Sequence, residues 1–351
     1  MAVEAGEPVR GVARPRLRDV AALAGVSHQT VSRVFKDDAS VRAQTRERVM
    51  DAAARLDYRP NAIARALATG SSRTLGVISF DTALFGPASA ISAIESSARG
   101  AGYYTSVMSL SQAGHYTVAE VADRLRGQGV DGVVLIPGHV PVGQILRHLP
   151  ARLPTVVLGR SSDVPAIGID HCDGARAAVN YLLELGHRTV HHVPGPEDWP
   201  EACERFRGWW QALAAKRVPV PPVLPGDWSA MSGYTRGCVL AADREVTAVF
   251  AANDHIALGV LWALQEAGRR VPEDVSVIGF DGVPEAAYFT PPLTTVRQDF
   301  AEIGRRGVEL LVEQIGARHS SATVPDIRPV QATIPSGLIV RRSTTRPVLP
   351  A

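Results

Sequence analysis

The stretch from residue 16 to residue 35, RLRDVAALAGVSHQTVSRVF, constrains the fold of this chain more than any other segment. Its apolar residues have the spacing of two short helices with a break at Gly25. A glycine there can adopt the positive φ of a tight turn, and the Ser27 hydroxyl can cap the second helix. The pattern predicts a helix–turn–helix, whose second helix fits the major groove of DNA.

The following residues extend this small all-α unit. Residues 44–58 have the apolar stripe of a third amphipathic helix, which Pro60 ends. Asn61 is placed to cap a further short helix through Leu67, and the Gly70 region predicts a flexible joint. We therefore expect a headpiece that is separated from the rest of the chain by a hinge helix and linker.

Positive charge is concentrated in the same part of the chain. Residues 10–73 carry thirteen Arg or Lys and only six Asp or Glu, whereas the whole chain of 351 residues has a net charge of +2. A basic head on a nearly neutral body indicates a polyanionic partner, which here is double-stranded DNA. Contacts to phosphates would make such binding strongly salt-dependent.

Length and cysteine usage exclude several classes of protein. No apolar run reaches 18 residues, so we expect no membrane span, and residues 1–15 predict a disordered leader rather than a signal peptide. The three cysteines, Cys172, Cys203 and Cys238, form no CxxC, which suggests neither disulfides nor a metal site. These features fit a cytoplasmic protein.

From residue 75 onward, short apolar runs alternate with helical patterns. Strands are expected at 74–80, 103–110, 130–137, 154–159, 189–195, 220–224, 247–253 and 275–281, and helices around 88–101, 116–129, 173–186, 201–216, 230–242 and 255–268. Alternation of this kind predicts parallel sheets with crossover helices, and two such runs predict two doubly wound lobes. Ligands bind at the carboxyl ends of the strands in this architecture, so a cleft between the lobes is the expected site. No GxGxxG or GKS/T motif follows a strand, so no nucleotide cofactor is expected.

The ends of the later strands carry side chains suited to a sugar. Asn253 and Asp281 each follow a strand, Arg205 lies near the start of a helix, and Trp228 lies in a loop before another. An indole can stack on the C–H face of a sugar ring, while guanidinium, amide and carboxylate groups bind its hydroxyls. For Asp254, the sequence favours a helix cap or a lobe-bridging role over a ligand contact.

Residues 17–78 resemble the headpiece and hinge of the LacI/GalR family of bacterial transcription regulators, and the resemblance continues to about residue 340. It rests on LRDVAALAGVSHQTVSRV and VRAQTRERVMDAAARLDYRPNAIARALATGSSRTLGVI. It implies a helix–turn–helix headpiece and hinge helix followed by a two-lobed α/β domain like that of periplasmic binding proteins. The implied division is leader 1–15, headpiece 16–60, hinge and linker 61–73, first lobe 74–170 and 296–325, second lobe 171–295 and 326–341, and tail 342–351.

The resemblance also implies how the headpiece meets DNA. Base edges would be read by His28, Gln29 and Arg33, with Thr30 and Ser32 on phosphates. Paired hinge helices would enter the minor groove, where Leu67 is the apolar wedge. The implied DNA-contacting residues are Leu17, Ser27, His28, Gln29, Thr30, Ser32, Arg33, Asn61, Ala64, Leu67 and Ala68. Lys36 and Arg42 depart from the usual family residues at their positions.

Three motifs, GDWSAMSGY, ANDHIALG and PPLTTVRQDF, carry the resemblance into the effector domain. They imply that Trp228 is a stacking platform and that Phe300 closes the apolar side of the pocket. Phe80, Asp81 and Gly159 depart from the family pattern, and we expect Phe80 to offer a second stacking face. The expected effector-binding residues are Phe80, Arg205, Trp228, Asn253, Asp281 and Phe300.

The expected function is that of a homodimeric repressor, released from a palindromic operator by a sugar or glycoside. Residues 337–351 lack the leucine heptads of a tetramerising coiled coil, so a dimer is favoured. Coupling between effector and DNA sites would be allosteric. Alternatives are a regulator with a non-sugar or co-repressing metabolite, a secreted sugar-binding protein, or a glycosidase using Asp254 and Asp281. Neither of the last two would need the headpiece, and we expect no enzymatic activity.

Overall fold

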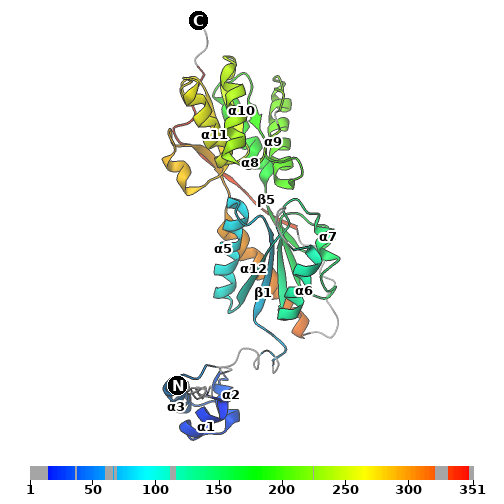
Figure 1. Cartoon of the computed structure of the whole chain (residues 1–351), viewed down its shortest axis with the longest axis vertical. Coiled ribbons are helices and arrows are strands. Elements are labelled where there is room, and N and C mark those ends of the chain that lie inside the picture. The colour runs from blue at the N-terminus through cyan, green and yellow to red at the C-terminus, as the bar shows by residue number, and fades with distance from the viewer. Residues whose placement is uncertain are drawn as a thin grey trace, which may run out of the picture. The chain divides into compact units, whose positions relative to one another are not determined.

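The computed structural model describes residues 15–35, 38–59, 66, 69–110, 116–223, 225–320 and 331–347 (Figure 1). The chain divides into two compact units, residues 1–72 and residues 73–351. The division falls inside the linker that the sequence predicts at 61–73. Within the described residues, no helix is both long enough and apolar enough to cross a membrane.

The first unit contains the predicted helix–turn–helix and the third helix. Its helices are α1 (Leu17–Ala24), α2 (His28–Phe35) and α3 (Ala43–Arg55). Gly25 has φ 63° and closes the C-terminus of α1, as the sequence predicts. The backbone N–H of Thr30 donates to the Ser27 hydroxyl (3.1 Å), which confirms the predicted cap of α2. Val20, Val31 and Val49, one from each helix, are fully buried and form the centre of a small core.

The first lobe of the second unit is a sheet with strand order β10-β5-β4-β3-β1-β2, in which all pairs are parallel. Its strands are β1 (Thr74–Phe80), β2 (Tyr104–Leu110), β3 (Gly132–Ile136), β4 (Thr155–Leu158), β5 (Ala166–Ile169) and β10 (Gln331–Ile334). Its helices are α5 (Phe85–Gly100), α6 (Val118–Gln128), α7 (Val142–Leu146) and α12 (Phe300–Ser320). One core cluster lies under α5 and α12, and another lies on the face of α6 and α7.

The second lobe is a sheet with strand order β11-β9-β8-β7-β6, in which only the β11–β9 pair is antiparallel. Its strands are β6 (His191–Val193), β7 (Ala248–Ala251), β8 (Ser276–Asp281), β9 (Thr294–Arg297) and β11 (Gly337–Ile339). Its helices are α8 (His171–Glu184), α9 (Pro200–Lys216), α10 (Ala230–Ala242), α11 (Asp254–Glu266) and the short 3₁₀ helix η1 (Pro284–Tyr288). Helices α8 and α9 cover one face, and α10 and α11 cover the other.

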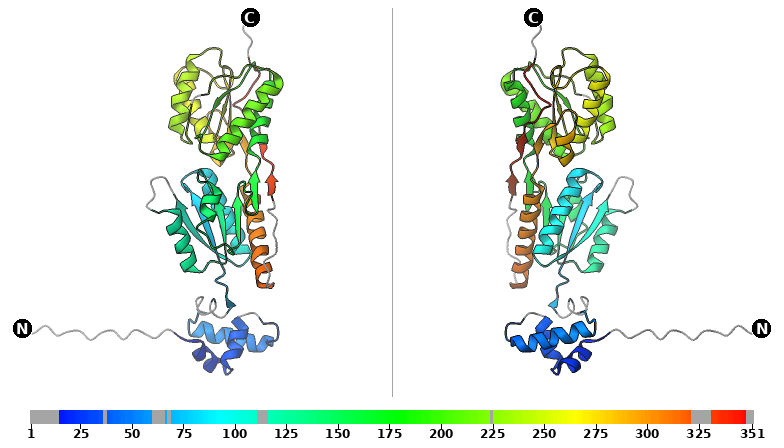
Figure 2. Two further views of the ribbon diagram at one scale, coloured as in Figure 1. Left: turned by 90° about the vertical axis from the view of Figure 1, so that its right-hand side faces the viewer. Right: turned by 90° about the vertical axis from the view of Figure 1, so that its left-hand side faces the viewer.

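The chain passes between the lobes after β5, after β9 and after β10, and Figure 2 shows these segments side by side. The carboxyl ends of β1, β3 and β4 therefore face the carboxyl ends of β7 and β8. Because each lobe directs the ends of its strands at the other, side chains at these ends meet in one place.

Two expectations need correction. Residues 331–334 form β10, which pairs with β5, so they belong to the first lobe rather than to a second-lobe segment 326–341. The strand expected at 220–224 is absent at residues 220–223, and residue 224 lies outside the described part. Two prolines in VPPVL remove the backbone donors that a central strand needs.

Candidate functional site

A cavity of about 250 Å³ lies between the two lobes. The first lobe contributes the start of α5 and the ends of β3 and β4, and the second contributes the starts of α8 and α9 and the ends of β7 and β8. Five of the six predicted effector residues line it: Arg205, Trp228, Asn253, Asp281 and Phe300. The fold thus brings together side chains that lie almost 100 positions apart in the sequence.

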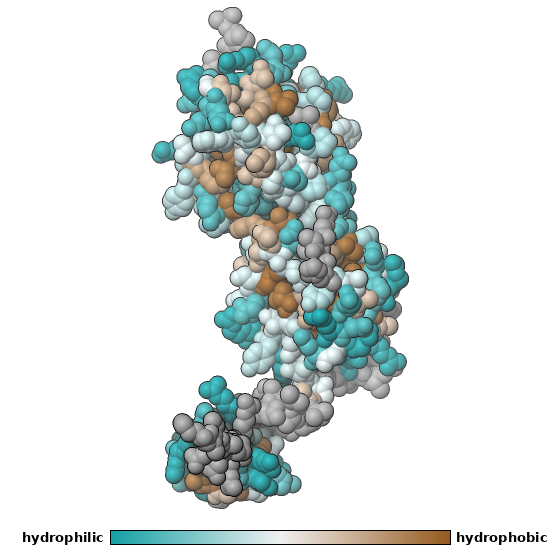
Figure 3. Space-filling model, viewed as in Figure 1, coloured by the Kyte–Doolittle hydropathy of each residue, from teal (hydrophilic) through white to brown (hydrophobic). Residues whose placement is uncertain are grey.

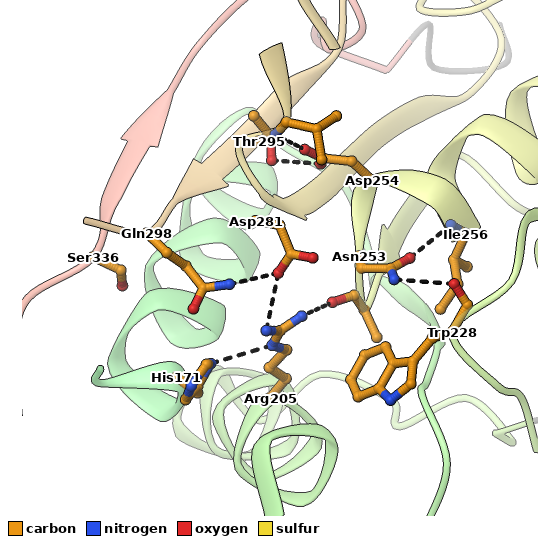
Figure 4. Close-up of polar contacts among 12 residues, drawn as sticks. His171, Arg205, Trp228, Asn253, Asp254, Ile256, Asp281, Thr295, Gln298 and Ser336 are labelled. Atoms are coloured by element: carbon orange, nitrogen blue, oxygen red, sulfur yellow. Dashed lines mark hydrogen bonds and ion pairs between the residues drawn. The ribbon is translucent and has the colours of Figure 1, made fainter. Parts of the chain in front are cut away.

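Arg205 forms the polar centre of the cavity (Figure 4). Its Nη2 lies 3.0 Å from Asp281 Oδ1, and its Nη1 donates to the carbonyl oxygen of Ala252. Its Nε donates to His171 Nδ1 (3.3 Å), while the guanidinium lies over the Phe280 ring, 3.9 Å from the centroid. Because five N–H groups are available on a guanidinium, these contacts orient Arg205 and leave donors for a ligand.

Asp281 is held by two partners and an unusual backbone. Gln298 Nε2 donates to the same Oδ1 that faces Arg205 (2.6 Å). The φ of Asp281 is 104°, which turns the chain sharply at the end of β8. Burial raises the pKa of Asp281, an effect that the Arg205 cation opposes. The carboxylate keeps Oδ2 as an acceptor.

His171 is neutral in this setting. Burial, followed by the nearby Arg205 cation, lowers its pKa well below the ordinary value. Since Nδ1 accepts from Arg205, the ring proton lies on Nε2, where it is a further donor at the cavity.

Trp228 and Asn253 are coupled to each other. Asn253 Oδ1 accepts from the Ile256 backbone N–H (2.7 Å) and so caps α11, while its Nδ2 donates to the Trp228 carbonyl oxygen (3.1 Å). The residue that caps α11 is therefore Asn253 and not Asp254. Asn253 lines the cavity, but much of its amide is used to position the loop that carries Trp228.

Aromatic side chains contribute much of the apolar wall, together with aliphatic side chains. Phe300 packs edge-to-face against Phe85, with centroids 5.8 Å apart. The Trp228 ring meets Trp199 edge-to-face at the same separation. A sugar ring requires apolar faces of this kind beside polar hydroxyl partners.

The structure does not bring Phe80 into this cavity. It is the last residue of β1 and is only 4% exposed, and its ring packs edge-to-face against His139. The sequence placed it correctly near a strand end, but its side chain faces the first-lobe core. Trp199 lines the cavity, and its ring rather than that of Phe80 can offer a second stacking face.

Asp254 lies behind the cavity wall, fully buried. Its carboxylate accepts from Thr295 Oγ1 (2.6 Å) and from the Val283 backbone N–H (2.8 Å), so it ties α11 to β9 and to the turn after β8. Burial, with a smaller contribution from Asp281, raises its pKa to about 7. The second carboxylate of the glycosidase alternative is thus not presented to a substrate.

The cavity residues that sequence reasoning missed include His171, Trp199, Glu201 and Gln298. His171 lies in the crossover after β5, and Gln298 lies in the crossover after β9. A polar residue in a crossover between lobes is a sequence signal that could have identified both as cavity residues. Trp199 and Glu201 begin α9 only a few residues before Arg205. The described residues include no group of three or more His, Cys, Asp or Glu side chains arranged to hold a metal ion.

The headpiece presents a polar helix face to solvent. His28, Gln29 and Arg33 on α2 are exposed, whereas Thr30 and Ser32 are half-buried. Ser27 is exposed and its hydroxyl is tied to Thr30, and Leu17 packs partly against the headpiece core. Asn61, Ala64, Leu67 and Ala68 lie outside the described residues, as does Lys36.

Two of the basic residues that the sequence counted toward a DNA-binding surface are turned inward. Arg48 donates through Nη2 to the carbonyl oxygens of Ala24 and Gly25, at the C-terminus of α1. Arg46 donates to the carbonyl oxygens of Val34 and Asp38, beside the end of α2. Both arginines thus satisfy helix-terminal acceptors and fasten α3 to the other two helices.

Each of the two units matches a known protein family over part of its length. Residues 16–61 match the family of bacterial regulatory proteins of the lacI type, and residues 179–344 match a periplasmic binding protein-like domain. The lactose operon repressor of Escherichia coli strain K12 is 35% identical over 301 residues, covering 85% of this chain and 84% of the repressor.

Two solved structures resemble the chain closely along its length. The lac repressor dimer bound to operator and the anti-inducer ONPF has a TM-score of 0.82 and 32% identity, covering 94% of this chain and 99% of the repressor chain. A complex of the transcriptional regulator CelR with cellobiose has a TM-score of 0.68 and 32% identity, covering 94% of this chain and 100% of the other.

Proposed function

This chain belongs to the LacI family of bacterial regulatory proteins, and from that premise we propose that it represses sugar-utilisation genes and leaves a palindromic operator when a sugar or glycoside binds between its lobes. The relatives are transcriptional repressors. The chain is accordingly a DNA-binding transcriptional regulator rather than an enzyme, and we expect it to act in the bacterial cytoplasm.

The observation that carries the proposal is the arrangement around Arg205. A guanidinium with spare donors, a carboxylate with a spare acceptor and the neutral His171 face the same cavity as Trp228 and Phe300. Sugars combine hydroxyls that need paired hydrogen bonds with C–H faces that need aromatic contact. The CelR complex with cellobiose supports a saccharide as the ligand class.

The DNA-binding part of the proposal rests on α2. Its exposed His28, Gln29 and Arg33 are placed to read base edges in the major groove, where Arg and Gln form bidentate contacts. The solved complex of a lac repressor dimer with operator supports this role. We assign Leu67 and its neighbours to a hinge in the minor groove by family resemblance alone.

We propose a dimer face that uses exposed apolar side chains of both lobes, on α10 and α11 and on β2. Apolar surface gathers over α10 and α11 in the view of Figure 3. The exposed apolar side chains on these helices include Met231, Val239, Leu258 and Trp262. Tyr104 and Val107 are exposed on β2, the edge strand of the first sheet. Patches of this kind mark interfaces, and two-fold symmetric DNA requires a two-fold symmetric protein.

In the proposed mechanism, effector binding shifts the lobes and thereby changes the spacing of the two headpieces. A hinge helix of seven or eight residues is unstable alone in water, so its folding depends on DNA and on the partner hinge. The coupling free energy expected is on the order of 1–3 kcal/mol and must act equally in both directions.

The test is selection of short palindromic duplexes by the purified protein, repeated with a panel of mono- and disaccharides. Selection of one palindrome, and its release by one sugar, is the expected result. A selected palindrome that no sugar affects would retain the DNA assignment and reject the sugar effector. Tighter operator binding with a sugar would make that sugar a co-repressor.

A further inference from the structure

A second cavity, of about 950 Å³, opens beside the first. It is bounded by the residues after β3 and β4, the crossover after β5, the start of α9 and strand β10. Five residues line both cavities and so define a neck between them: Gly138, Gly159, Ile169, His171 and Glu201. The two cavities are therefore adjoining parts of one interlobe space.

Glu201 stands in this neck with an unsatisfied carboxyl oxygen. Its Oε2 is buried and has no hydrogen-bond partner in the structure. Burial raises the pKa of Glu201, although the Arg205 cation one turn further along α9 acts to lower it. A buried polar atom without a partner is costly unless a ligand completes it.

Aromatic rings lead from the first cavity to the second. Trp228 contacts Trp199, and Trp199 contacts His139, whose ring centroid is 5.9 Å away. Trp228 and Trp199 line the first cavity, and His139 lines the second. His139 Nδ1 is also buried without a partner. A row of rings flanked by unsatisfied polar atoms suits a chain of sugar units, each of which has an apolar face and polar edges.

The far part of the second cavity is polar. Arg160 from the first lobe lies 3.5 Å from Glu204 of α9, which also pairs with Arg207. Ser161, Ser162, Asp163 and Asp198 complete a lining rich in donors and acceptors. An apolar aglycone would shield these polar groups from water without replacing its hydrogen bonds, whereas sugar hydroxyls would form hydrogen bonds with them.

Resting on the sugar-binding function proposed above, we infer that the effector is an elongated glycoside of two or more sugar rings, which passes from the first cavity through the neck into the second and donates a hydroxyl hydrogen bond to Glu201. Gly159, which follows β4, contributes no side chain to the neck. A phosphorylated sugar would place a second negative group beside this acid, so neutral saccharides are preferred.

The first experiment is calorimetric titration of the full-length protein with matched series: glucose, maltose and maltotriose; glucose, cellobiose and cellotriose; galactose and lactose. We expect a di- or trisaccharide to bind at least about tenfold more tightly than its parent monosaccharide, which corresponds to about 1.4 kcal/mol. Equal or tighter binding of the monosaccharide would overturn the elongated effector and keep the sugar function. Binding of none of them would reject both.

The second experiment narrows the second cavity alone. Thr333 is an exposed residue of β10 that lines only this cavity, so Thr333→Trp adds bulk there with little risk to the core. The control is Glu313→Trp on the exposed side of α12, outside both cavities. Thr333→Trp should weaken the tightest long ligand about tenfold relative to the control and leave its parent monosaccharide unchanged. Equal affinities of the two variants for the long ligand would refute the inference.

The Glu201→Gln variant tests the neck itself. It retains the shape of the side chain and replaces one carboxyl oxygen with an NH2 group, which cannot accept a hydrogen bond from a hydroxyl. Affinity for the long ligand should fall by about tenfold at pH 7, whereas operator binding without ligand should not change. An unchanged affinity would remove Glu201 from the subsite.

Discussion

Arg205 and Asp281 form an ion pair that joins α9 to the end of β8, with both side chains at most 7% exposed. A pair buried this deeply adds little net stability, because both charges have lost their hydration. The ion pair instead fixes the orientation of two side chains that we expect to bind the ligand. Two other side chains bound to the pair, His171 and Gln298, lie in crossovers between the lobes. The relative position of the lobes and ligand binding therefore depend on one hydrogen-bond network.

Removing one member of this pair should be costly. We expect Asp281→Asn to lower the free energy of unfolding by about 3 kcal/mol, because the Arg205 cation stays buried without its counter-ion. The control is Glu309→Gln, which breaks the exposed pair with Arg305 on α12 and should cost less than about 1 kcal/mol. Urea denaturation of both variants measures the difference. Equal losses would show that burial does not set the strength of the effect.

Trp228 should contribute most of the aromatic contact to an effector. We expect Trp228→Ala to weaken binding of the inducing saccharide by about tenfold or more, as loss of a large stacked surface requires. Trp210→Ala is the matched control, because Trp210 is 49% exposed and lies outside both cavities. Calorimetric titration of both variants makes the comparison. If the two variants lose the same affinity, the stacking role is wrong.

Stability should fall in mild acid because of His192. Burial lowers the pKa of His192 to about 4, so the folded protein resists protonation that the unfolded chain accepts near pH 6.5. Between these values the unfolded state binds more protons, and stability decreases as the pH falls, by up to about 1.4 kcal/mol per pH unit. Above pH 6.5 this contribution is constant.

The His192→Phe variant isolates that effect. The ring is stacked on Phe250 and lies beside Trp209, so a phenyl group fits its surroundings. The variant should show a shallower loss of stability from pH 6.5 to 4 in urea denaturation. His171, His187 and His191 also have lowered pKa values, so some acid sensitivity will persist. An unchanged slope would exclude His192 as a contributor.

Base reading by α2 predicts a change of specificity and not only of affinity. We expect Arg33→Ala to cost about 1–3 kcal/mol on the selected palindrome and to relax the preference at one base pair in each half-site. The control is Arg55→Ala, since Arg55 pairs with Asp51 on the surface of α3. Fluorescence anisotropy on single-base variants of the palindrome gives both quantities. A uniform loss over all sequences would assign Arg33 to phosphate.

The dimer face should be sensitive to charge. Trp262 on α11 is 54% exposed, and Met231 on α10 is 71% exposed. Trp262→Asp should convert the protein from dimer to monomer in sedimentation velocity at micromolar concentration, because a buried unpaired charge opposes association. Trp210→Asp on α9 should remain dimeric. A dimeric Trp262→Asp variant would move the interface elsewhere.

The sequence predicted most accurately those elements whose ends carry their own signals. Gly25 and Ser27 define the turn between α1 and α2 by local chemistry alone. The start of α11 was predicted less well, because the cap is Asn253 and not Asp254. Strand β10 was assigned to the wrong lobe, because its partner β5 lies more than 150 residues earlier and no local pattern specifies that pairing. Phe80 was placed at the correct strand end, but the direction of its side chain depends on His139 and Gly138 across the fold. Trp199 was missed because its role follows from its packing against Trp228.

Among the described residues, the headpiece core consists of residues between 17 and 58, and the cores of the two lobes consist of residues beyond the linker. Substitutions on α2 and substitutions around Arg205 therefore disturb different sets of packed side chains. During evolution, operator specificity and effector specificity can therefore change independently. Recombination at the linker can also exchange one of them without the other. The linker is also the position at which an engineered regulator could receive a different effector domain and keep the same DNA-binding headpiece.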